Sequence, residues 1–410
     1  MTDNKTAGAP LFEKILIANR GEIAVRIIRT CRKLGICTVA VFSEIDSRAM
    51  HVQEADESVL LGPAPAEQSY LAKEKIITAA QDRGCQAIHP GYGFLSENAS
   101  FAEMTVAAGL AFIGPPAPVI AMLGDKIASK NLAMQLGVPV VPGHNEPVSD
   151  LAELRSIADA IGYPVLLKPA AGGGGRGMRI VHGPDELEAA LRAGQEETRK
   201  AFSDSTIFLE RYVQDPRHIE IQIMADQHGN VIHLGERECS IQRRYQKVIE
   251  EAPSLALTPD MRREIGERAC SLARAAGYSS AGTVEFILDP QGNFYFLEMN
   301  TRLQVEHPVT EMITGLDLVE LQLQIATGRP LAFGQEDVTL NGWSIEARIC
   351  AEEPERNFLP STGLVTRYAE PRGTNIRMDS GIMVGSRVSV YYDSLLTKAV
   401  SWGKDREEAR

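Results

Sequence analysis

Short apolar runs alternate with longer amphipathic segments in the first third of the chain. Lys14 to Ala18 and Cys37 to Phe42 have the pattern of buried strands. Between them, Gly21 to Gly35 carries apolar residues at helical spacing and stops at a glycine. The alternation of strand and helix continues as far as Leu110 to Gly114. This order predicts a parallel, doubly wound α/β sheet.

The pattern changes after the turn-rich residues 113–118. From about residue 164 to 298, helical segments mix with pairs of strand patterns, which turn near residues 228–230 and 290–292. These pairs predict antiparallel hairpins and therefore a second region of α+β type. A third, strand-rich region begins near Trp343 and includes the strand-like segment SRVSVYY.

Composition and charge restrict the class of protein. A chain of 410 residues is long enough for two or three domains, and 44% hydrophobic with 23% charged residues is ordinary for a folded protein. The net charge of −12 argues against a general nucleic-acid binder. No apolar run approaches the roughly 20 residues of a membrane span, and the first ten residues lack a signal-peptide core. The six cysteines are scattered without zinc-site spacing, so we expect reduced thiols and a cytoplasmic location.

A glycine-rich segment follows an apolar strand pattern that ends at Lys168. Glycines occupy positions 172 to 175 and 177. Such a run costs backbone entropy, but its exposed N–H groups can wrap phosphate oxygens closely. Because the strand pattern Met178 to Val181 comes next, we interpret the segment as a hairpin lid over phosphates. A flexible surface loop is the alternative.

Two acidic strand patterns carry the candidate metal ligands. Glu285 lies in TVEFILD, and Glu298 and Asn300 lie in FYFLEMN, where a spacing of two puts both side chains on one face. The two segments have the pattern of hairpin partners, which would bring Glu285 close to the other two residues. Carboxylates and an amide oxygen are suitable ligands for Mg²⁺ or Mn²⁺. Salt-bridged acids at a strand end are the alternative.

Arg302, Gln304 and Glu306 also recur at a spacing of two. In an extended segment their side chains would point one way, so that Arg302 could bind a small anion and Glu306 could accept a proton. Neighbouring cations would hold the pKa of Glu306 down. A structural ion pair is the alternative, and the basic cluster at residues 243–247 is by itself compatible with a solvated face.

Seven segments together resemble the biotin carboxylase component of biotin-dependent carboxylases, a branch of the ATP-grasp superfamily. The resemblance runs from about Lys14 to the end of the chain, in the family's order. The segments are KILIANRGEIAVRI, AIHPGYGFLSEN, KPAAGGGGRGMRIV, RHIEIQI, ERECSIQRRYQKVIEEAP, EMNTRLQVEHPVTEMITG and YYDSLLTK. The resemblance implies a flexible tail at 1–10, a Rossmann-like N-terminal domain at 11–124, an ATP-grasp domain at 125–328 with a lid at about 140–214, and a smaller C-terminal domain at 340–410. That last domain would be truncated, because the family's domain normally continues for about one more helix.

The resemblance also implies four groups of site residues. ATP would be contacted by Lys126, Lys168, Gly173, Gly174, Gly175, Glu210, Arg211, Val213, His218 and Gln242. Mg²⁺ or Mn²⁺ would be bound by Glu285, Glu298 and Asn300. Bicarbonate would be held by Lys247, Arg302, Gln304, Val305 and the base Glu306. Biotin would be contacted by Arg348, which would stabilise its enolate oxygen, and Tyr92 and Gly93 would lie near it.

The activity implied by the resemblance is carboxylation of biotin with ATP and bicarbonate, through carboxyphosphate. No biotinyl-lysine motif and no carboxyltransferase region occur here, so the expected partners are a biotin carboxyl carrier protein or domain and a carboxyltransferase subunit. A homodimer is expected if the C-terminus is complete. The segment QRRYQKVIEEAP favours an acyl-CoA carboxylase over a pyruvate carboxylase.

One position departs from the family's pattern. Tyr245 stands where many members have a histidine near the ATP phosphates, and a phenol cannot carry a positive charge. That contact must be weaker or different in this chain. Two other readings stay open: another ATP-grasp ligase that forms an acyl phosphate, and a non-catalytic nucleotide-binding subunit.

Overall fold

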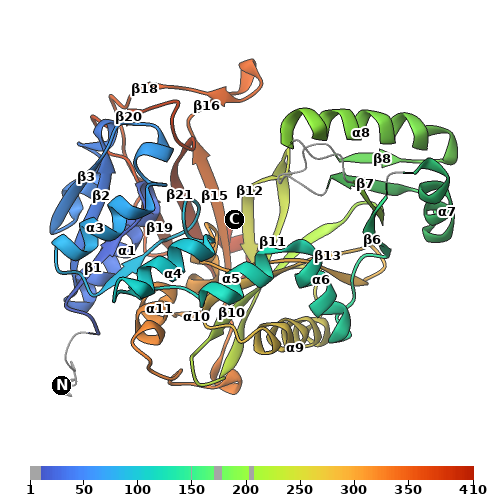
Figure 1. The fold of residues 1–410 in the computed structure, drawn as a ribbon. Coiled ribbons are helices and arrows are strands. Elements are labelled where there is room, and N and C mark those ends of the chain that lie inside the picture. The colour runs from blue at the N-terminus through green and yellow to red at the C-terminus, as the bar shows by residue number, and fades with distance from the viewer. Residues whose placement is uncertain (1–10, 149, 170–177, 203–206) are drawn as a thin grey trace.

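In the computed structural model, the N-terminal region forms a parallel sheet with the strand order β3-β2-β1-β4-β5. The structure describes residues 11–148, 150–169, 178–202 and 207–410 (Figure 1). The strands are β1 (Lys14–Ile17), β2 (Cys37–Ser43), β3 (Glu57–Gly62), β4 (Ala87–His89) and β5 (Ala111–Phe112).

Helices cover both faces of this sheet. They are α1 (Gly21–Leu34), α2 (Met50–Glu54), α3 (Lys73–Asp82) and α4 (Ala99–Ala107). Ile15 of β1 packs with Ile23 of α1 on one face, whereas Leu16, the next residue, packs with Ile76 of α3 on the other. A strand that is buried on both faces reads as a continuous apolar run, as this one does. The predicted doubly wound parallel sheet is therefore confirmed.

Three details of the sequence pattern were misleading. Strand β3 was not expected, and residues 113–118 were assigned to a boundary although α5 (Ala117–Gly124) begins there. Pro118 is tolerated in the first turn of α5 because the N–H that proline lacks has no helical partner there. The strand-like segment SRVSVYY is wrong in extent: only β20 (Arg387–Val388) pairs, with the two residues of β18 (Gly363–Leu364), and Val390 beyond it is 73% exposed.

The second and third regions share one eight-stranded antiparallel sheet. Its order is β14-β13-β10-β11-β12-β15-β21-β19. The strands are β10 (Arg217–Ala225), β11 (Val231–Arg243), β12 (Gln246–Ala252), β13 (Ser280–Leu288), β14 (Phe294–Asn300), β15 (Trp343–Cys350), β19 (Ile376–Ser380) and β21 (Leu395–Gly403). Both expected hairpins, β10 with β11 and β13 with β14, are confirmed. The strand-rich C-terminal region joins this sheet where β15 pairs with β12.

A four-stranded sheet with the order β6-β9-β7-β8 forms the lobe at the upper right of Figure 1. It consists of β6 (Gly143–Val148), β7 (Val165–Pro169), β8 (Arg179–Val181) and β9 (Ile207–Arg211), with the helices α7 (Leu151–Ile161) and α8 (Leu187–Phe202). Leu154 and Leu191 of the helices pack with Val165 and Leu209 of the strands in a core of their own. The lobe is therefore a separately packed layer beside the large sheet.

The remaining helices connect these layers. They are α6 (Lys126–Gln135), α9 (Pro259–Ala275), α10 (His307–Thr314), α11 (Leu318–Ala326) and α12 (Arg406–Ala409). Ile265 and Leu272 of α9 pack with Ile219 and Ile221 of β10, so α9 covers one face of the large sheet. None of the helices in the described part of the chain is long and apolar enough to cross a membrane.

Candidate active site

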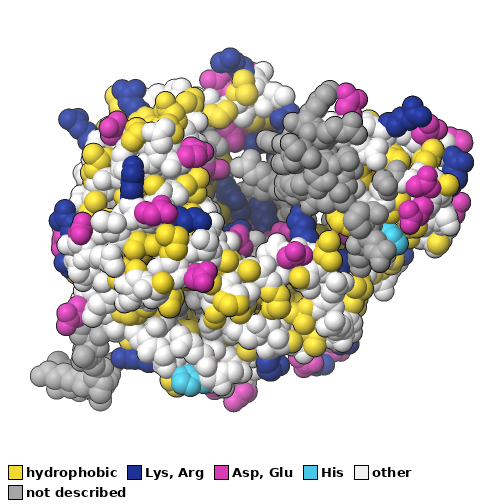
Figure 2. All heavy atoms as spheres, in the orientation of Figure 1, with side chains coloured by type: hydrophobic (Ala, Val, Ile, Leu, Met, Phe, Trp, Pro, Cys, Tyr) yellow, Lys and Arg dark blue, Asp and Glu magenta, His cyan; other side chains and the backbone are white. Residues whose placement is uncertain are grey.

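A cavity of about 800 Å³ opens between the small lobe and the large sheet. Figure 2 shows this hollow, with dark blue lysine and arginine side chains in its depth. Its lining combines residues of β7 and β9 with residues of β10 to β14, of the loop before α10, and Arg348 of β15. This volume lies in the usual range for small-molecule sites.

Three glutamates form a row across neighbouring strands of the large sheet. Glu220 of β10 lies opposite Glu285 of β13, and Glu285 lies opposite Glu298 of β14. Directly opposite residues on adjacent strands share one face of the sheet, with their Cβ atoms about 5 Å apart. Glu220 and Glu285 are buried. Buried charge of one sign at this density needs cations beside it.

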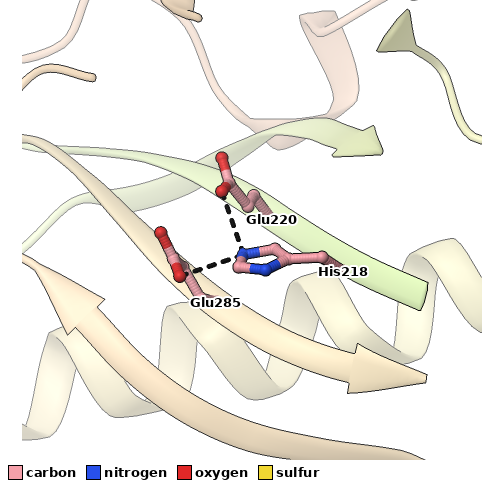
Figure 3. A group of neighbouring side chains, drawn as sticks. All are labelled: His218, Glu220 and Glu285. Carbon is pink, nitrogen blue, oxygen red and sulfur yellow. Dashed lines mark ion pairs between the residues drawn. The ribbon is translucent and has the colours of Figure 1, made fainter. Parts of the chain in front are cut away.

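Lys247 and His218 supply part of the positive charge. The Lys247 ammonium contacts Glu220 and lies 3.1 Å from Glu285 Oε1. His218 Nε2 lies 3.1 Å from Glu220 Oε1 and 2.9 Å from Glu285 Oε2 (Figure 3). Burial opposes protonation of His218, but its interactions with the two carboxylates raise its pKa to about 10. The three groups of Figure 3 form a tightly spaced ion cluster, with their ligand atoms close enough together to hold a metal ion.

Arg237 of β11 supplies further positive charge beside the glutamates and connects several elements. Its side chain is fully buried. Its two Nη atoms donate to Gln222 at 2.6 Å, Thr310 at 3.1 Å, Glu220 at 3.3 Å, Thr283 at 3.0 Å and Gln304 at 2.7 Å. Gln304 then donates to Glu285 Oε1 at 2.8 Å. The charge of the row is thus compensated from within the sheet.

Glu298, the last glutamate of the row, differs from the other two in its contacts and its pKa. It lines the cavity, and among the described residues its carboxylate has no hydrogen-bond or ion-pair partner. Burial and the charge of Glu285 raise the pKa of Glu298. A divalent cation between the two carboxylates would neutralise both, so they fit a metal site. Asn300 donates to Glu285 Oε1 at 2.7 Å and accepts from Arg302 at 2.9 Å, which leaves one lone pair of its oxygen for a ligand.

Glu306 is a buried carboxylate between two cations. Its Oε1 lies 2.7 Å from Lys247 Nζ, and its Oε2 lies 2.9 Å from Arg348 Nη2. Burial opposes ionisation of Glu306, but the charges of Lys247, Arg348 and Arg237 outweigh it and lower its pKa. The carboxylate is therefore ionised at neutral pH and faces the cavity, as a proton acceptor must.

The segment from Arg302 to Glu306 is not the extended strand that its spacing predicted. It forms an irregular turn, because α10 begins directly after it. Arg302, Gln304, Val305 and Glu306 nevertheless all line the cavity. Arg302 Nε also lies 2.7 Å from Glu97 Oε2, so the residue combines a structural ion pair with a place on the cavity wall.

The wall formed by the small lobe and α6 carries lysines. Lys168 of β7 contacts the Glu210 carboxylate of β9, and Lys130 Nζ lies 2.8 Å from Glu210 Oε1. Burial opposes ionisation of Glu210, but the two lysines lower its pKa. Lys126 is the first residue of α6 and lines the same cavity. Gln242 also lines it, with Nε2 3.2 Å from His218 Nδ1.

Several expected contact residues do not line the cavity. Arg211 contacts the hydroxyl of Tyr295 at 3.2 Å. Tyr92 donates its hydroxyl hydrogen bond to Glu22 of α1. The others are Val213 and Gly93, which lie outside the lining, and Gly173, Gly174 and Gly175, which lie outside the described residues.

Three charged residues of the site were not expected from the sequence: Glu220, Arg237 and Lys130. In RHIEIQI, the polar residues Glu220 and Gln222 alternate with isoleucines, a pattern that normally indicates one solvent-exposed face. Here α9 covers the isoleucine face, and the polar face is also fully buried. Arg237 could have been found from the segment GERECS, because it places a charged residue inside a strand that pairs with RHIEIQI.

Three family models together match almost the entire chain. Residues 11–120 match the model described as Biotin carboxylase, N-terminal domain. Residues 125–333 match Carbamoyl-phosphate synthase L chain, ATP binding domain. Residues 346–410 match Biotin carboxylase C-terminal domain.

Curated relatives match over nearly the same range. The propionyl-CoA carboxylase alpha chain of Ruegeria pomeroyi is 52% identical over 97% of this chain and 62% of its own length. The mitochondrial propionyl-CoA carboxylase alpha chain of Homo sapiens is 52% identical over 97% of this chain and 55% of its own length. The chain thus spans only a little more than half of these relatives.

Solved structures share the whole fold. The biotin carboxylase domain of Hydrogenobacter thermophilus 2-oxoglutarate carboxylase, a dimer with MgADP, ADP and bicarbonate, has a TM-score of 0.91 and 51% identity, covering 97% of this chain and 88% of that one. The β-γ-ATP complex of Campylobacter jejuni biotin carboxylase has a TM-score of 0.92 and 46% identity, covering 97% of this chain and 89% of that one. With this coverage by family models, relatives and structures, the chain belongs to the biotin carboxylase family.

Proposed function

We propose that this chain carboxylates biotin on a carrier protein, using ATP and bicarbonate, as the first half-reaction of an acyl-CoA carboxylase. The observation that carries the proposal is the ionised Glu306, held between Lys247 and Arg348 on the wall of a cavity that also contains paired carboxylates and lysines. Bicarbonate activation needs such a base beside cations that hold the anion.

Lys247 and Arg302 would bind bicarbonate, and Gln304 and Val305 would complete its pocket. Glu306 would accept the bicarbonate proton while a bicarbonate oxygen attacks the γ-phosphorus of ATP, which releases ADP and forms carboxyphosphate. The geometry supports this order because Lys247 Nζ lies only 2.7 Å from Glu306 Oε1, so anion and base share one cation.

Lys126 and Lys168 would neutralise the ATP phosphates, and Glu285, Glu298 and Asn300 would hold Mg²⁺ or Mn²⁺. The metal ion supplies positive charge to the transferring phosphoryl group. Glu210, Arg211, Val213, His218 and Gln242 would contact the nucleotide. Among these, Glu210, His218 and Gln242 line the cavity in the structure.

Arg348 would stabilise the enolate oxygen of biotin after carboxyphosphate has released CO₂, with Tyr92 and Gly93 nearby. Its position supports this role, because it lines the cavity and contacts the base Glu306. The domain boundaries proposed from the sequence, 11–124, 125–328 and 340–410, would then place ATP and biotin sites on different units that meet at this cavity.

The relatives support an acyl-CoA substrate for the complete enzyme. They include propionyl-CoA and methylcrotonoyl-CoA carboxylase alpha chains, although biotin carboxylase domains of 2-oxoglutarate and pyruvate carboxylases are similar as well. The expected partners are a biotin carboxyl carrier protein or domain and a carboxyltransferase subunit, and the dimer of the Hydrogenobacter domain supports a homodimer.

The test is ATP hydrolysis by the purified chain, measured with and without bicarbonate and with and without free biotin. Hydrolysis that requires bicarbonate and rises with biotin supports the proposal. Hydrolysis that depends instead on an amine acceptor would indicate another ATP-grasp ligase. ATP binding without any turnover would indicate a non-catalytic subunit.

A further inference from the structure

Two buried glutamates face each other behind Arg348. Glu250 of β12 lies opposite Glu346 of β15 in the register of the two strands, and both are fully buried. Side chains at directly opposite positions are close enough to interact, and like charges there are destabilising. Neither residue lines the cavity, and neither belongs to the groups proposed above to touch ATP, metal, bicarbonate or biotin.

Glu250 has a specific contact with Arg348. Its Oε1 accepts from Arg348 Nε at 2.7 Å and lies 2.6 Å from Nη2, while the same Nη2 lies 2.9 Å from Glu306 Oε2. The guanidinium is therefore held on one side by Glu250 and on the other by the base. A planar guanidinium fixed at two edges has one orientation in the site.

Glu346 has no such contact. Within the described residues, neither of its carboxylate oxygens has a hydrogen-bond partner. The nearby ammonium of Lys398 donates to the Val305 carbonyl at 2.7 Å and lies 3.2 Å from Glu22 Oε1. An ionised carboxylate that is buried without a hydrogen bond is very costly, so the group is neutral when it is buried in this way.

The titratable groups that face the pair come from three strands and two loops. Burial raises the pKa of Glu250 and that of Glu346. The charge of Glu306 adds to both shifts, and the charge of Glu250 adds to the shift of Glu346. The surrounding titratable groups are Arg348, Lys398, Lys247, Glu306 and Tyr92. The three cations favour one ionised carboxylate in the pair, and the contact with Arg348 places that charge on Glu250.

We propose that Glu346 is a permanently protonated acid that leaves Glu250 as the only anion of the pair, and that Glu250 is the positioning residue for Arg348. This inference rests on the proposed function, because Arg348 meets biotin there. The orientation of Arg348 would then depend on the protonation of Glu346, which lies outside the cavity.

The first experiment compares Glu→Gln variants of the 410-residue chain in the bicarbonate- and biotin-dependent ATPase assay. Glu250→Gln is expected to lower kcat for the biotin-dependent reaction about 100-fold without changing KM for ATP, because Arg348 loses its orientation. Glu346→Gln, a neutral replacement for a protonated acid, is expected to keep the wild-type kcat. Wild-type kcat in Glu250→Gln, or an equal loss in Glu346→Gln, would overturn the proposal.

Glu236→Gln is the matched control. Glu236 is a fully buried glutamate of β11 that accepts from Arg262 at 2.6 and 2.7 Å, and neither residue lines the cavity. This variant should lower the denaturation midpoint and keep kcat. If Glu250→Gln does not fold, Glu250→Asp replaces it, because a shorter carboxylate keeps the charge but cannot reach Arg348. An Asp variant with full kcat would refute the positioning role.

The second experiment measures the denaturation midpoint of wild type and Glu346→Gln against pH. A carboxyl group whose pKa is raised by folding keeps the native state fully stable only below its unfolded pKa, about 4.3, and destabilises it as pH rises. The midpoint of Glu346→Gln should therefore exceed that of wild type by a margin that grows from about pH 4.5 to 8. A margin that grows in the opposite direction would mean that Glu346 is ionised and would overturn the proposal.

The two experiments separate this inference from the proposed function. A wild-type chain without bicarbonate-dependent turnover would contradict the proposed function. The pH dependence of the Glu346→Gln midpoint would still decide whether the acid is protonated.

Discussion

At the scale of single residues, the site shifts the pKa values of neighbouring carboxyl groups in opposite directions. Glu306 is ionised because Lys247 and Arg348 hold it, whereas Glu298 has a raised pKa because it is buried beside Glu285. The pKa of the same residue type thus shifts up or down within one cavity, depending on the charges beside it. Two substitutions test these roles.

Replacing the base should stop chemistry and spare nucleotide binding. Glu306→Gln removes the proton acceptor but keeps the size of the side chain, so kcat is expected to fall by about 10²- to 10⁴-fold. The affinity for MgATP, measured by calorimetric titration, should change little. A variant that loses ATP binding would contradict the assignment of Glu306 as the base.

Replacing one carboxylate of the row should weaken the metal site. Glu298→Gln leaves Glu285 alone to neutralise a divalent cation, so the Mg²⁺ concentration for half-maximal ATPase activity should rise. Mn²⁺, titrated in parallel, should show the same direction. An unchanged Mg²⁺ titration would exclude Glu298 as a ligand.

At the scale of elements, Arg237 joins β11 to β10, to β13 and to α10. It donates to Gln222 and Glu220 of β10, to Thr283 of β13 and to Thr310 of α10. These contacts tie the side chains of three strands and one helix together around the buried guanidinium. Besides Lys247 and His218, the row of carboxylates is thus supported by a buried cation that does not line the cavity.

Arg237→Met should destabilise the fold strongly, because the buried Glu220 loses a compensating charge. Removing one partner of a buried ion pair typically costs about 3–5 kcal/mol. Denaturant unfolding measures this loss, and a second substitution, Glu220→Gln, should restore part of it. If the double variant is no more stable than Arg237→Met, the two residues are not coupled as described.

At the scale of the whole molecule, the N-terminal domain and the large sheet meet at α1. Lys398 of β21 bridges the two, because its ammonium donates to the Val305 carbonyl and lies near Glu22 of α1. Arg26 of α1 pairs with Glu311 of α10 at 2.7 Å. The loop that carries the base is thus positioned by residues that lie far away in the sequence.

Gly381 lies where the C-terminal region approaches the start of α1. A Cβ atom there would lie 2.4 Å from the Glu22 backbone nitrogen and 2.8 Å from the Gly21 carbonyl carbon. Gly381→Ala must therefore push α1 away and should cost about 1–3 kcal/mol in unfolding free energy. Gly183→Ala is the control, because nothing lies within 4 Å of its Cβ position, and it should change stability by less than about 0.5 kcal/mol. Equal stabilities of the two variants would show that the contact between Gly381 and the start of α1 can relax without cost.

The parallel sheet and the hairpins could be predicted because they depend on local periodicity. The strand β1 and the helix α1 have apolar spacing that each segment displays by itself, and the pairing of Glu285 with Glu298 follows from one short hairpin. The element α5 was missed because a proline in the first turn of a helix has the same local pattern as a proline in a loop.

The sequence by itself determined the elements, the family resemblance and the residue types that chemistry requires. Only the tertiary structure decided which charges meet. Glu220, Arg237, Glu250 and Glu346 lie in strands whose polar residues resemble a solvent-exposed face, and their burial results from packing against segments distant in the chain. Ionisation and metal affinity depend on such through-space neighbours, because electrostatic energy follows distance and burial and does not depend on position along the chain.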